Sequence, residues 1–150
     1  MKKLFITLFL LIITATFAYC QEIYKIGDTA DVQNVSVTIN SISGHRERNS
    51  LIRKDGIKYY VLEITVLNGR RESYEYNAYQ FTMLDDNENE YQWCISTVEP
   101  KFEGENLQPG MIGRGFLVFG IPTERTPAQI VFDPGYIHDD VIKFNIINVK

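Results

Sequence analysis

The fold of this chain is decided by the stretch Leu107-Gln108-Pro109-Gly110-Met111-Ile112-Gly113-Arg114-Gly115-Phe116-Leu117-Val118-Phe119-Gly120-Ile121-Pro122. Pro109-Gly110 predicts a tight turn, because proline presets one backbone torsion and glycine accepts the positive φ that follows. Gly113 and Gly115 allow another backbone to come close, and the apolar run that follows them is typical of a core strand. Pro122 cannot donate to a β-ladder and ends the run.

Alternating apolar residues predict further strands on both sides of this stretch. The clearest runs from Lys58 to Leu67 and ends at the turn signal Asn68-Gly69, with Tyr60, Leu62, Ile64 and Val66 facing the core. An earlier strand begins at Val35, and a break in its alternation predicts a bulge or a strand end near Ser41. Later strands are predicted from Tyr79 to Met83 and from Val141 to Val149. With about eight short strands and no apolar repeat at helical spacing after residue 20, the pattern predicts one all-β sandwich domain.

The N-terminus has the pattern of a secretory signal peptide. Met1-Lys2-Lys3 is a short positive segment, and an apolar run follows from Leu4 to Phe17. This run is shorter than the ~20 residues that a membrane span requires. We therefore expect a signal peptide at residues 1–20 and a mature domain at residues 21–150, exported to the periplasm, the medium or the membrane surface.

Cys20 and Cys94 are the two cysteines, and the sequence leaves the fate of Cys20 open. Cys20 stands where a bacterial lipoprotein is cleaved and acylated, but Tyr19 before it is larger than usual. If Cys20 is retained without lipid, it can pair with Cys94 in an oxidising compartment, a bridge worth about 4 kcal/mol in the chain-entropy model. The third alternative is that neither occurs and Cys94 is a small buried hydrophobic residue.

Several motifs together resemble the domain of unknown function 4352 family, an immunoglobulin-like sandwich of exported bacterial proteins and lipoproteins. They are Ile26-Gly27-Asp28-Thr29, Tyr59 to Val66 running into Asn68, Leu84-Asp85-Asp86 before Tyr91, Leu107-Gln108-Pro109-Gly110, and Gly115 to Phe119 leading to Ile121-Pro122. The resemblance implies an immunoglobulin-like antiparallel β-sandwich of about seven to eight strands. It implies export as well, and it supplies no catalytic residues.

Composition and charge exclude several classes of protein. The chain is 45% hydrophobic and 23% charged, which is too apolar for a disordered protein and too charged for a membrane bundle. Its net charge is −4 and it has no basic run, so nucleic acid is not expected as a partner. The membrane is expected as a partner only through a lipid anchor at Cys20.

Catalytic and cofactor motifs are missing from the sequence. It contains no Gly-x-Ser-x-Gly, His-Glu-x-x-His or phosphate-binding Gly-Lys-Ser/Thr pattern. His45 and His138 are the only histidines, which excludes a histidine-rich zinc site. We therefore expect no catalytic residues, no metal site and no cofactor, although a serine, histidine and aspartate brought together from distant loops remain an alternative.

The acidic turn from Asp85 to Glu90 is the best metal candidate. Asp85, Asn87 and Asn89 match the first three ligand positions of a calcium loop. Glu90 stands where that loop requires glycine, and Ser96 stands where it requires a bidentate glutamate. An acidic hairpin tip is the preferred interpretation.

Aromatic residues are concentrated on two neighbouring predicted strands, at Tyr74, Tyr76, Tyr79, Tyr91 and Trp93. If Tyr74, Tyr76 and Tyr91 face water, they form a stacking patch suited to a glycan or a protein. The alternative is that Tyr79, Phe81 and Trp93 fill the core. The sequence thus predicts a non-catalytic domain of the cell envelope that binds an unknown protein or glycan; the alternatives are a small-ligand or calcium-binding secreted protein and an envelope enzyme with a loop-built site.

Overall fold

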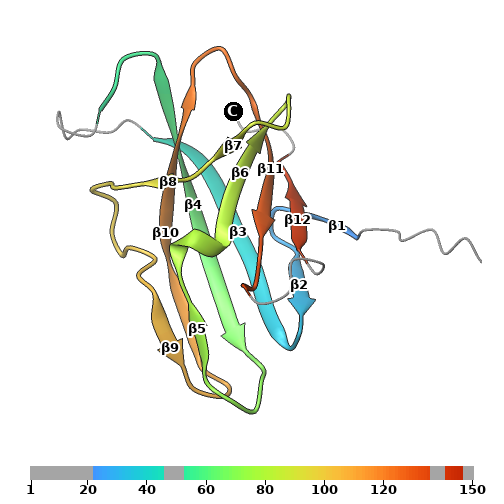
Figure 1. Cartoon of the computed structure of the whole chain (residues 1–150). Coiled ribbons are helices and arrows are strands. Elements are labelled where there is room, and N and C mark those ends of the chain that lie inside the picture. Colours follow the sequence, from blue (N-terminus) through green and yellow to red (C-terminus); the bar gives the residue numbers. More distant parts are fainter. Residues whose placement is uncertain (1–21, 46–52, 136–140, 147–150) are drawn as a thin grey trace, which may run out of the picture.

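Two five-stranded sheets pack face to face in the computed structural model, which describes residues 22–45, 53–135 and 141–146 (Figure 1). The first sheet has the order β1-β12-β11-β6-β7 and the second has the order β2-β3-β4-β10-β8, while β5 and β9 form a separate pair. The strands are β1 (Ile23–Lys25), β2 (Thr29–Val32), β3 (Val35–His45), β4 (Ile57–Asn68), β5 (Tyr74–Tyr76), β6 (Phe81–Asp85), β7 (Glu90–Tyr91), β8 (Trp93–Cys94), β9 (Glu105–Leu107), β10 (Ile112–Pro122), β11 (Pro127–Phe132) and β12 (Ile142–Asn145).

The β-sandwich predicted from the sequence is confirmed, with two differences in detail. The described residues contain twelve strands rather than seven or eight, because several are pieces of only two or three residues. The first sheet is mixed rather than purely antiparallel, since β1 pairs with β12 in parallel. The only helical element among the described residues is the short 3-10 helix η1 (Ala78–Gln80), and none of these residues forms a helix that could cross a membrane.

The centre of the second sheet is the antiparallel pair of β4 and β10, in register from Ile57 opposite Pro122 to Leu67 opposite Ile112. Leu62, Ile64 and Val66 are fully buried, as the alternation predicted. The inner face of β10 is buried against the other sheet in the same way, because side chains alternate between the two faces of a strand.

The bulge predicted near Ser41 is confirmed. The register of β3 against β4 shifts between Ile39 and Ser41, and pairing then continues as far as His45 opposite Tyr59. The extra residue explains why Ile42 falls out of the alternation that Val35 begins. The strand therefore continues past the bulge instead of ending there.

The two glycines of β10 make room for different neighbours. A Cβ atom added to Gly115 would lie 2.5 Å from the backbone nitrogen of Phe102, so another backbone does come close there, as predicted. A Cβ atom added to Gly113 would lie 2.5 Å from the ring of Tyr76. Tyr76 in turn packs against Phe102, so both glycines contribute to the placement of the same segment of chain.

A 3-10 turn replaces the start of a predicted strand. Residues 79–83 were expected to alternate as one strand, but the Asn77 side chain accepts a hydrogen bond from the Tyr79 N–H and the Gln80 side chain accepts one from the Asn77 N–H. This capping box forms η1, because local side-chain hydrogen bonds compete with a β-ladder. The strand β6 begins only at Phe81.

Candidate functional site: an aromatic pocket at the edge of the second sheet

The predicted aromatic patch does not form, because two of its three residues lie in the core. Tyr74 and Tyr76 are 1% and 2% exposed. They alternate with the exposed Glu75 along β5, so the pairing of β5 with β9 turns both rings inward. The Tyr76 ring packs 4.7 Å from that of Phe102, and Tyr91, which is half-buried, donates its hydroxyl proton to Asp85 over 2.9 Å. The prediction of a patch at Tyr74, Tyr76 and Tyr91 is therefore wrong.

A different pair of aromatic residues faces solvent. Tyr79 is 76% exposed because η1 turns it away from the core. Its ring and the half-buried Trp93 ring are T-shaped, with centroids 5.6 Å apart and an interplanar angle of 75°. The interpretation that Tyr79 fills the core is also wrong, whereas Phe81 is fully buried as expected. Neither the Tyr79 hydroxyl nor the Trp93 indole N–H donates to another of the residues that the structure describes, so both are available to a ligand.

These two rings border a pocket of about 370 Å³ at the edge of β10. Its floor is formed by Phe116, Leu117 and Val118, and Ile95, which is 69% exposed, lines it as well. A volume of this size falls in the usual range for small-ligand sites, ~300–1,000 Å³. The pocket is predominantly apolar, and the polar side chains at its border include Asn77, Ser96, Lys101 and Glu103.

The pocket exists because the segment that follows β8 moves away from β10 and then contacts it again. β8 pairs with β10 at Val118 and Phe119, and after Cys94 the chain moves away from the sheet. It returns where the Phe102 N–H donates to the Phe116 carbonyl over 3.0 Å and the Phe116 N–H donates to the Pro100 carbonyl over 2.8 Å. The gap between these two segments is the pocket.

Buried contacts fix the returning segment on the far side of the pocket. The Phe102 ring is 3% exposed and packs between Tyr76 and Phe81, with the Phe81 centroid 5.4 Å away. Gly104 lies against Asn77, since a Cβ atom there would be 3.1 Å from the Asn77 Cβ. The walls are thus held by core packing.

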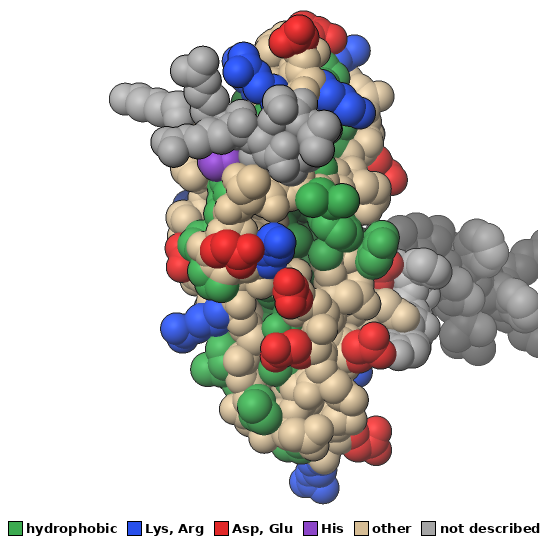
Figure 2. Space-filling model, turned by 90° about the vertical axis from the view of Figure 1, so that its left-hand side faces the viewer, with side chains coloured by type: hydrophobic (Ala, Val, Ile, Leu, Met, Phe, Trp, Pro, Cys, Tyr) green, Lys and Arg blue, Asp and Glu red, His purple; other side chains and the backbone are tan. Residues whose placement is uncertain are grey.

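A second hollow of about 300 Å³ lies on the other side of Tyr79. It shares Asn77 and Tyr79 with the aromatic pocket and is otherwise lined by Glu75, Gln80, Asp133 and Gly135. Tyr79 therefore stands between an apolar pocket and a polar one that carries two carboxylates. Figure 2, which faces the side of β8 and β9, shows acidic side chains across the middle of this surface beside exposed hydrophobic ones.

Cys94 is among the residues that line the aromatic pocket. Its Sγ donates to the Val118 carbonyl over 3.3 Å, and it packs on an outer cluster formed by Tyr59, Val61 and Val118. Cys20 lies outside the described residues, so its acylation and its bridge to Cys94 stay predictions.

The first carboxylate of the acidic turn, that of Asp85, accepts hydrogen bonds that hold the turn together. Both oxygens of Asp85, which is 2% exposed, accept hydrogen bonds from Asn89, and the backbone N–H of Asn87 and the hydroxyl of Tyr91 add two more. Burial raises the pKa of Asp85, but these hydrogen bonds outweigh it and lower the pKa to about 2. Arg125 adds an ion pair at 3.8 Å. Asp85 therefore closes the turn itself.

The histidines are not brought into a reactive cluster by the part of the chain that is described. His45 ends β3, and His138 lies outside the described residues. Within residues 22–45, 53–135 and 141–146, no three His, Cys, Asp or Glu side chains are grouped as metal ligands would be.

Sequence reasoning missed Tyr79 and Ile95 as residues of an exposed site. A signal for Tyr79 was present, because Asn77 followed three residues later by Gln80 is the pattern of a capping box. No comparable signal exists for Ile95, whose position depends on where the chain leaves β10.

Solved structures with the same fold come from several bacteria. The yjhA protein of Bacillus subtilis is 20% identical with a TM-score of 0.67, and the match covers 83% of this chain and 99% of that chain. The secreted protein MPT63 of Mycobacterium tuberculosis is 14% identical with a TM-score of 0.64, covering 86% and 100%. A candidate lipoprotein of Bacillus subtilis, ycdA, is 14% identical with a TM-score of 0.67, covering 79% of this chain and 38% of that chain.

Among curated proteins, no sequence matches this chain. The family model called "domain of unknown function (DUF4352)" matches residues 24–142, which include strands from both sheets and the whole aromatic pocket. This chain is therefore a member of the DUF4352 family of β-sandwich domains.

Proposed function

We propose that this protein is an exported, non-catalytic binding domain of the cell envelope and that the aromatic pocket is its ligand site. The observation that carries the proposal is the exposure of apolar side chains around a preformed hollow, with Tyr79 at 76% and Ile95 at 69%. Soluble domains rarely expose apolar groups together unless the surface has a partner. The proposal extends to this chain what the names of MPT63 and ycdA say of those proteins, a secreted protein and a candidate lipoprotein.

Export is tested by the intact mass of the protein purified from the envelope of cells that express the full chain. We expect a mature chain that lacks the N-terminal leader. Acyl groups on a chain that begins at Cys20 would make it a lipoprotein, and a gain of two hydrogens on reduction would show the Cys20–Cys94 bridge. A full-length chain that begins at Met1 and remains in the cytoplasm would overturn export.

Ligand binding at the pocket is tested with a neutral hydrophobic dye, N-phenylnaphthylamine. Trp93 is the only tryptophan of the chain and lines the pocket, so its fluorescence reports occupancy without a label. We expect saturable energy transfer from Trp93 to the dye, which Ile95→Ser weakens. Ile112→Ser is the matched control, because Ile112 is also exposed, at 49%, but does not line the pocket. Equal transfer in both variants, or none in the unmodified protein, would remove the pocket as the site.

The small-ligand alternative is supported by the same pocket, because its volume is that of a small-molecule site. Unlike a macromolecule, a small ligand would be enclosed by the pocket alone and would make no use of the charged border. Binding of charged peptides separates these two cases. The enzyme alternative would need a reactive group at the site, and the side chains that line the aromatic pocket include no histidine.

A further inference from the structure

The border of the aromatic pocket carries more negative than positive charge. Glu103 lines the pocket itself, and Glu75 and Asp133 line the hollow on the other side of Tyr79. Lys101 is the basic residue of the pocket lining, and its ammonium group pairs with Glu99 at 3.4 Å. The positive charge of Lys101 is thus balanced locally, whereas Glu75 and Glu103 have no such ion pair among the described residues.

The carboxylates of Glu75 and Glu103 are free to meet a ligand. Both side chains are exposed, and neither forms an ion pair or a side-chain hydrogen bond with any residue of the described part of the chain. Because carboxylates without a counterion lower the free energy of a nearby cation, Glu75 and Glu103 attract a cationic group.

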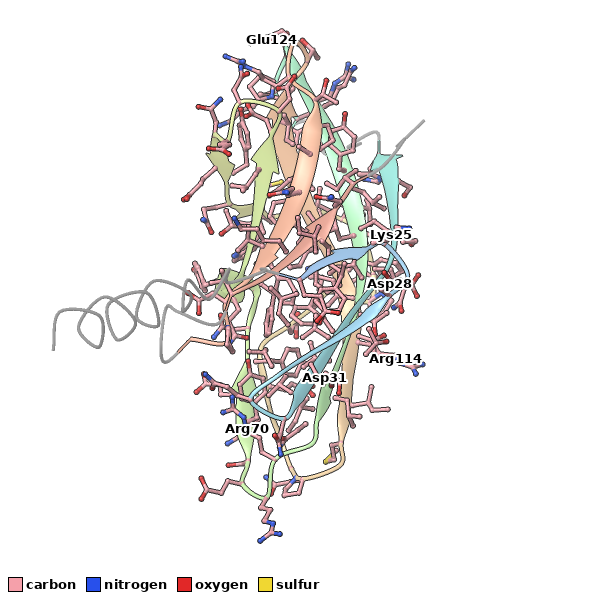
Figure 3. All side chains as sticks on the ribbon, turned by 90° about the vertical axis from the view of Figure 1, so that its right-hand side faces the viewer. Lys25, Asp28, Asp31, Arg70, Arg114 and Glu124 are labelled. Atoms are coloured by element: carbon pink, nitrogen blue, oxygen red, sulfur yellow. The ribbon has the colours of Figure 1, made fainter. Side chains whose placement is uncertain are left out.

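Charges of both signs occur on the opposite side of the molecule. Figure 3 faces that side, and the side chains that it labels on and beside β1 and β2 are the basic Lys25 and the acidic Asp28 and Asp31. The chain as a whole is acidic, with a net charge of −4, and the carboxylates beside the pocket belong to this excess.

We propose that the pocket binds a cationic segment of a partner protein, in which an apolar side chain of the size of Leu or Phe is flanked by Lys or Arg. The inference rests on the proposed function and specifies its ligand. The apolar side chain enters between Tyr79, Trp93 and Ile95, and the flanking cations lie over Glu75 and Glu103. Aromatic faces next to carboxylates also attract cations through the ring quadrupole.

A peptide fits this border better than a neutral glycan does. The Trp93 indole N–H and the Tyr79 hydroxyl have no partner among the described residues and can donate to the peptide carbonyls. A sugar can use the same rings and donors, but it leaves the excess carboxylates without counterions. Charge complementarity therefore favours the peptide.

The test uses three peptides that differ only in charge, with the protein purified from cells that express the full chain. They are Ac-Lys-Phe-Lys-Phe-Lys-amide, its Gln analogue and its Glu analogue, and binding is followed by the fluorescence of Trp93. We expect the Lys peptide to bind tightest and the Glu peptide weakest, with the preference for Lys falling as salt is raised. The double variant Glu75→Gln/Glu103→Gln is expected to bind the Lys peptide about five-fold more weakly, the scale of exposed ion pairs.

The double variant Glu72→Gln/Glu124→Gln is the charge-matched control, since both side chains are exposed and neither lines the pocket. Thermal melts confirm that all variants are folded. Equal affinity for the three peptides, no binding of any of them, or equal loss in both double variants overturns the inference. Quenching of Trp93 by the neutral oligosaccharide cellohexaose, with none by the Lys peptide, overturns it in favour of a glycan. If the neutral dye still binds in these cases, the proposed function stands and only the ligand class is wrong.

Discussion

The side-chain amide of Asn68 donates a 2.8 Å hydrogen bond to the backbone carbonyl of Leu107, 39 positions further along the chain. The same amide donates to the Glu72 carbonyl, and its oxygen accepts from the Arg70 N–H over 2.9 Å. The Asn68 carbonyl accepts from the Gly110 N–H over 2.7 Å. One fully buried residue thus joins two turns that the sequence predicts, Asn68-Gly69 and Pro109-Gly110.

Asn68→Ala is expected to lower the free energy of unfolding by about 2–6 kcal/mol, because two carbonyls lose their donors at roughly 1–3 kcal/mol each. Urea denaturation measures the change. Asn106→Ala is the control, since Asn106 is exposed and makes no side-chain hydrogen bond within the described residues. A difference between the two variants of less than about 1 kcal/mol would show that the Asn68 contacts do not stabilise the fold.

Gly115→Ala is expected to cost about 1–3 kcal/mol, the usual range for overpacking. The added Cβ atom would lie 2.5–2.6 Å from backbone atoms of Lys101 and Phe102, which cannot rotate away as a side chain can. We also expect the change to displace the far wall of the pocket and to weaken energy transfer from Trp93 to the hydrophobic dye.

Gly44→Ala is the matched control for Gly115→Ala. Gly44 also lies in a strand, and a Cβ atom added there would meet no described atom within 4 Å. Thermal unfolding should therefore leave this variant close to the unmodified protein. If both alanine variants unfold at the same temperature, the close approach at Gly115 is not rigid.

Stability is expected to fall at acidic pH through Asp85. The folded-state pKa of this group, about 2, lies below its ordinary value of 3.8. The ionised form therefore stabilises the fold fully above about pH 4, and this contribution is lost as pH falls through the folded pKa. As the pH falls from about 4 to about 2, the melting temperature of the unmodified protein should therefore decrease more steeply than that of Asp85→Asn.

Asp86→Asn is the control for the charge change at Asp85, because Asp86 is an exposed carboxylate on the same turn. Identical pH profiles for the unmodified protein and Asp85→Asn would contradict a role for the buried carboxylate. The hydrogen bonds that lower the pKa of Asp85 come from residues two to six positions away, so the loss of stability at acidic pH requires no ligand or partner.

Calcium is expected to leave the melting temperature unchanged. Both Asp85 oxygens already accept hydrogen bonds from Asn89, so a calcium ion would have to displace the groups that hold the turn. Calorimetry with and without calcium chloride measures this. A rise that saturates with calcium, and that Asp85→Asn abolishes, would restore the calcium-binding alternative.

Local patterns in the sequence were enough to specify the sandwich and its central strands. The alternation of Leu62, Ile64 and Val66 shows which face is buried, because side chains alternate along a strand and half of them must leave water. Gly115 indicated a close backbone approach and Ser41 a bulge for equally local reasons. These patterns lie within a few residues of one another, so they can be read without knowing what packs against them.

Which aromatic residues face water depends instead on how distant segments pack. Tyr74 and Tyr76 are buried because β5 pairs with β9, a choice made by residues about 30 positions away. Tyr79 is exposed because η1 turns the chain, and Ile95 is exposed because the segment after Cys94 leaves β10 and returns at Phe102. Whether a side chain is exposed depends on which distant segment packs over it in the folded protein. The alternation of residues along one strand does not identify that segment.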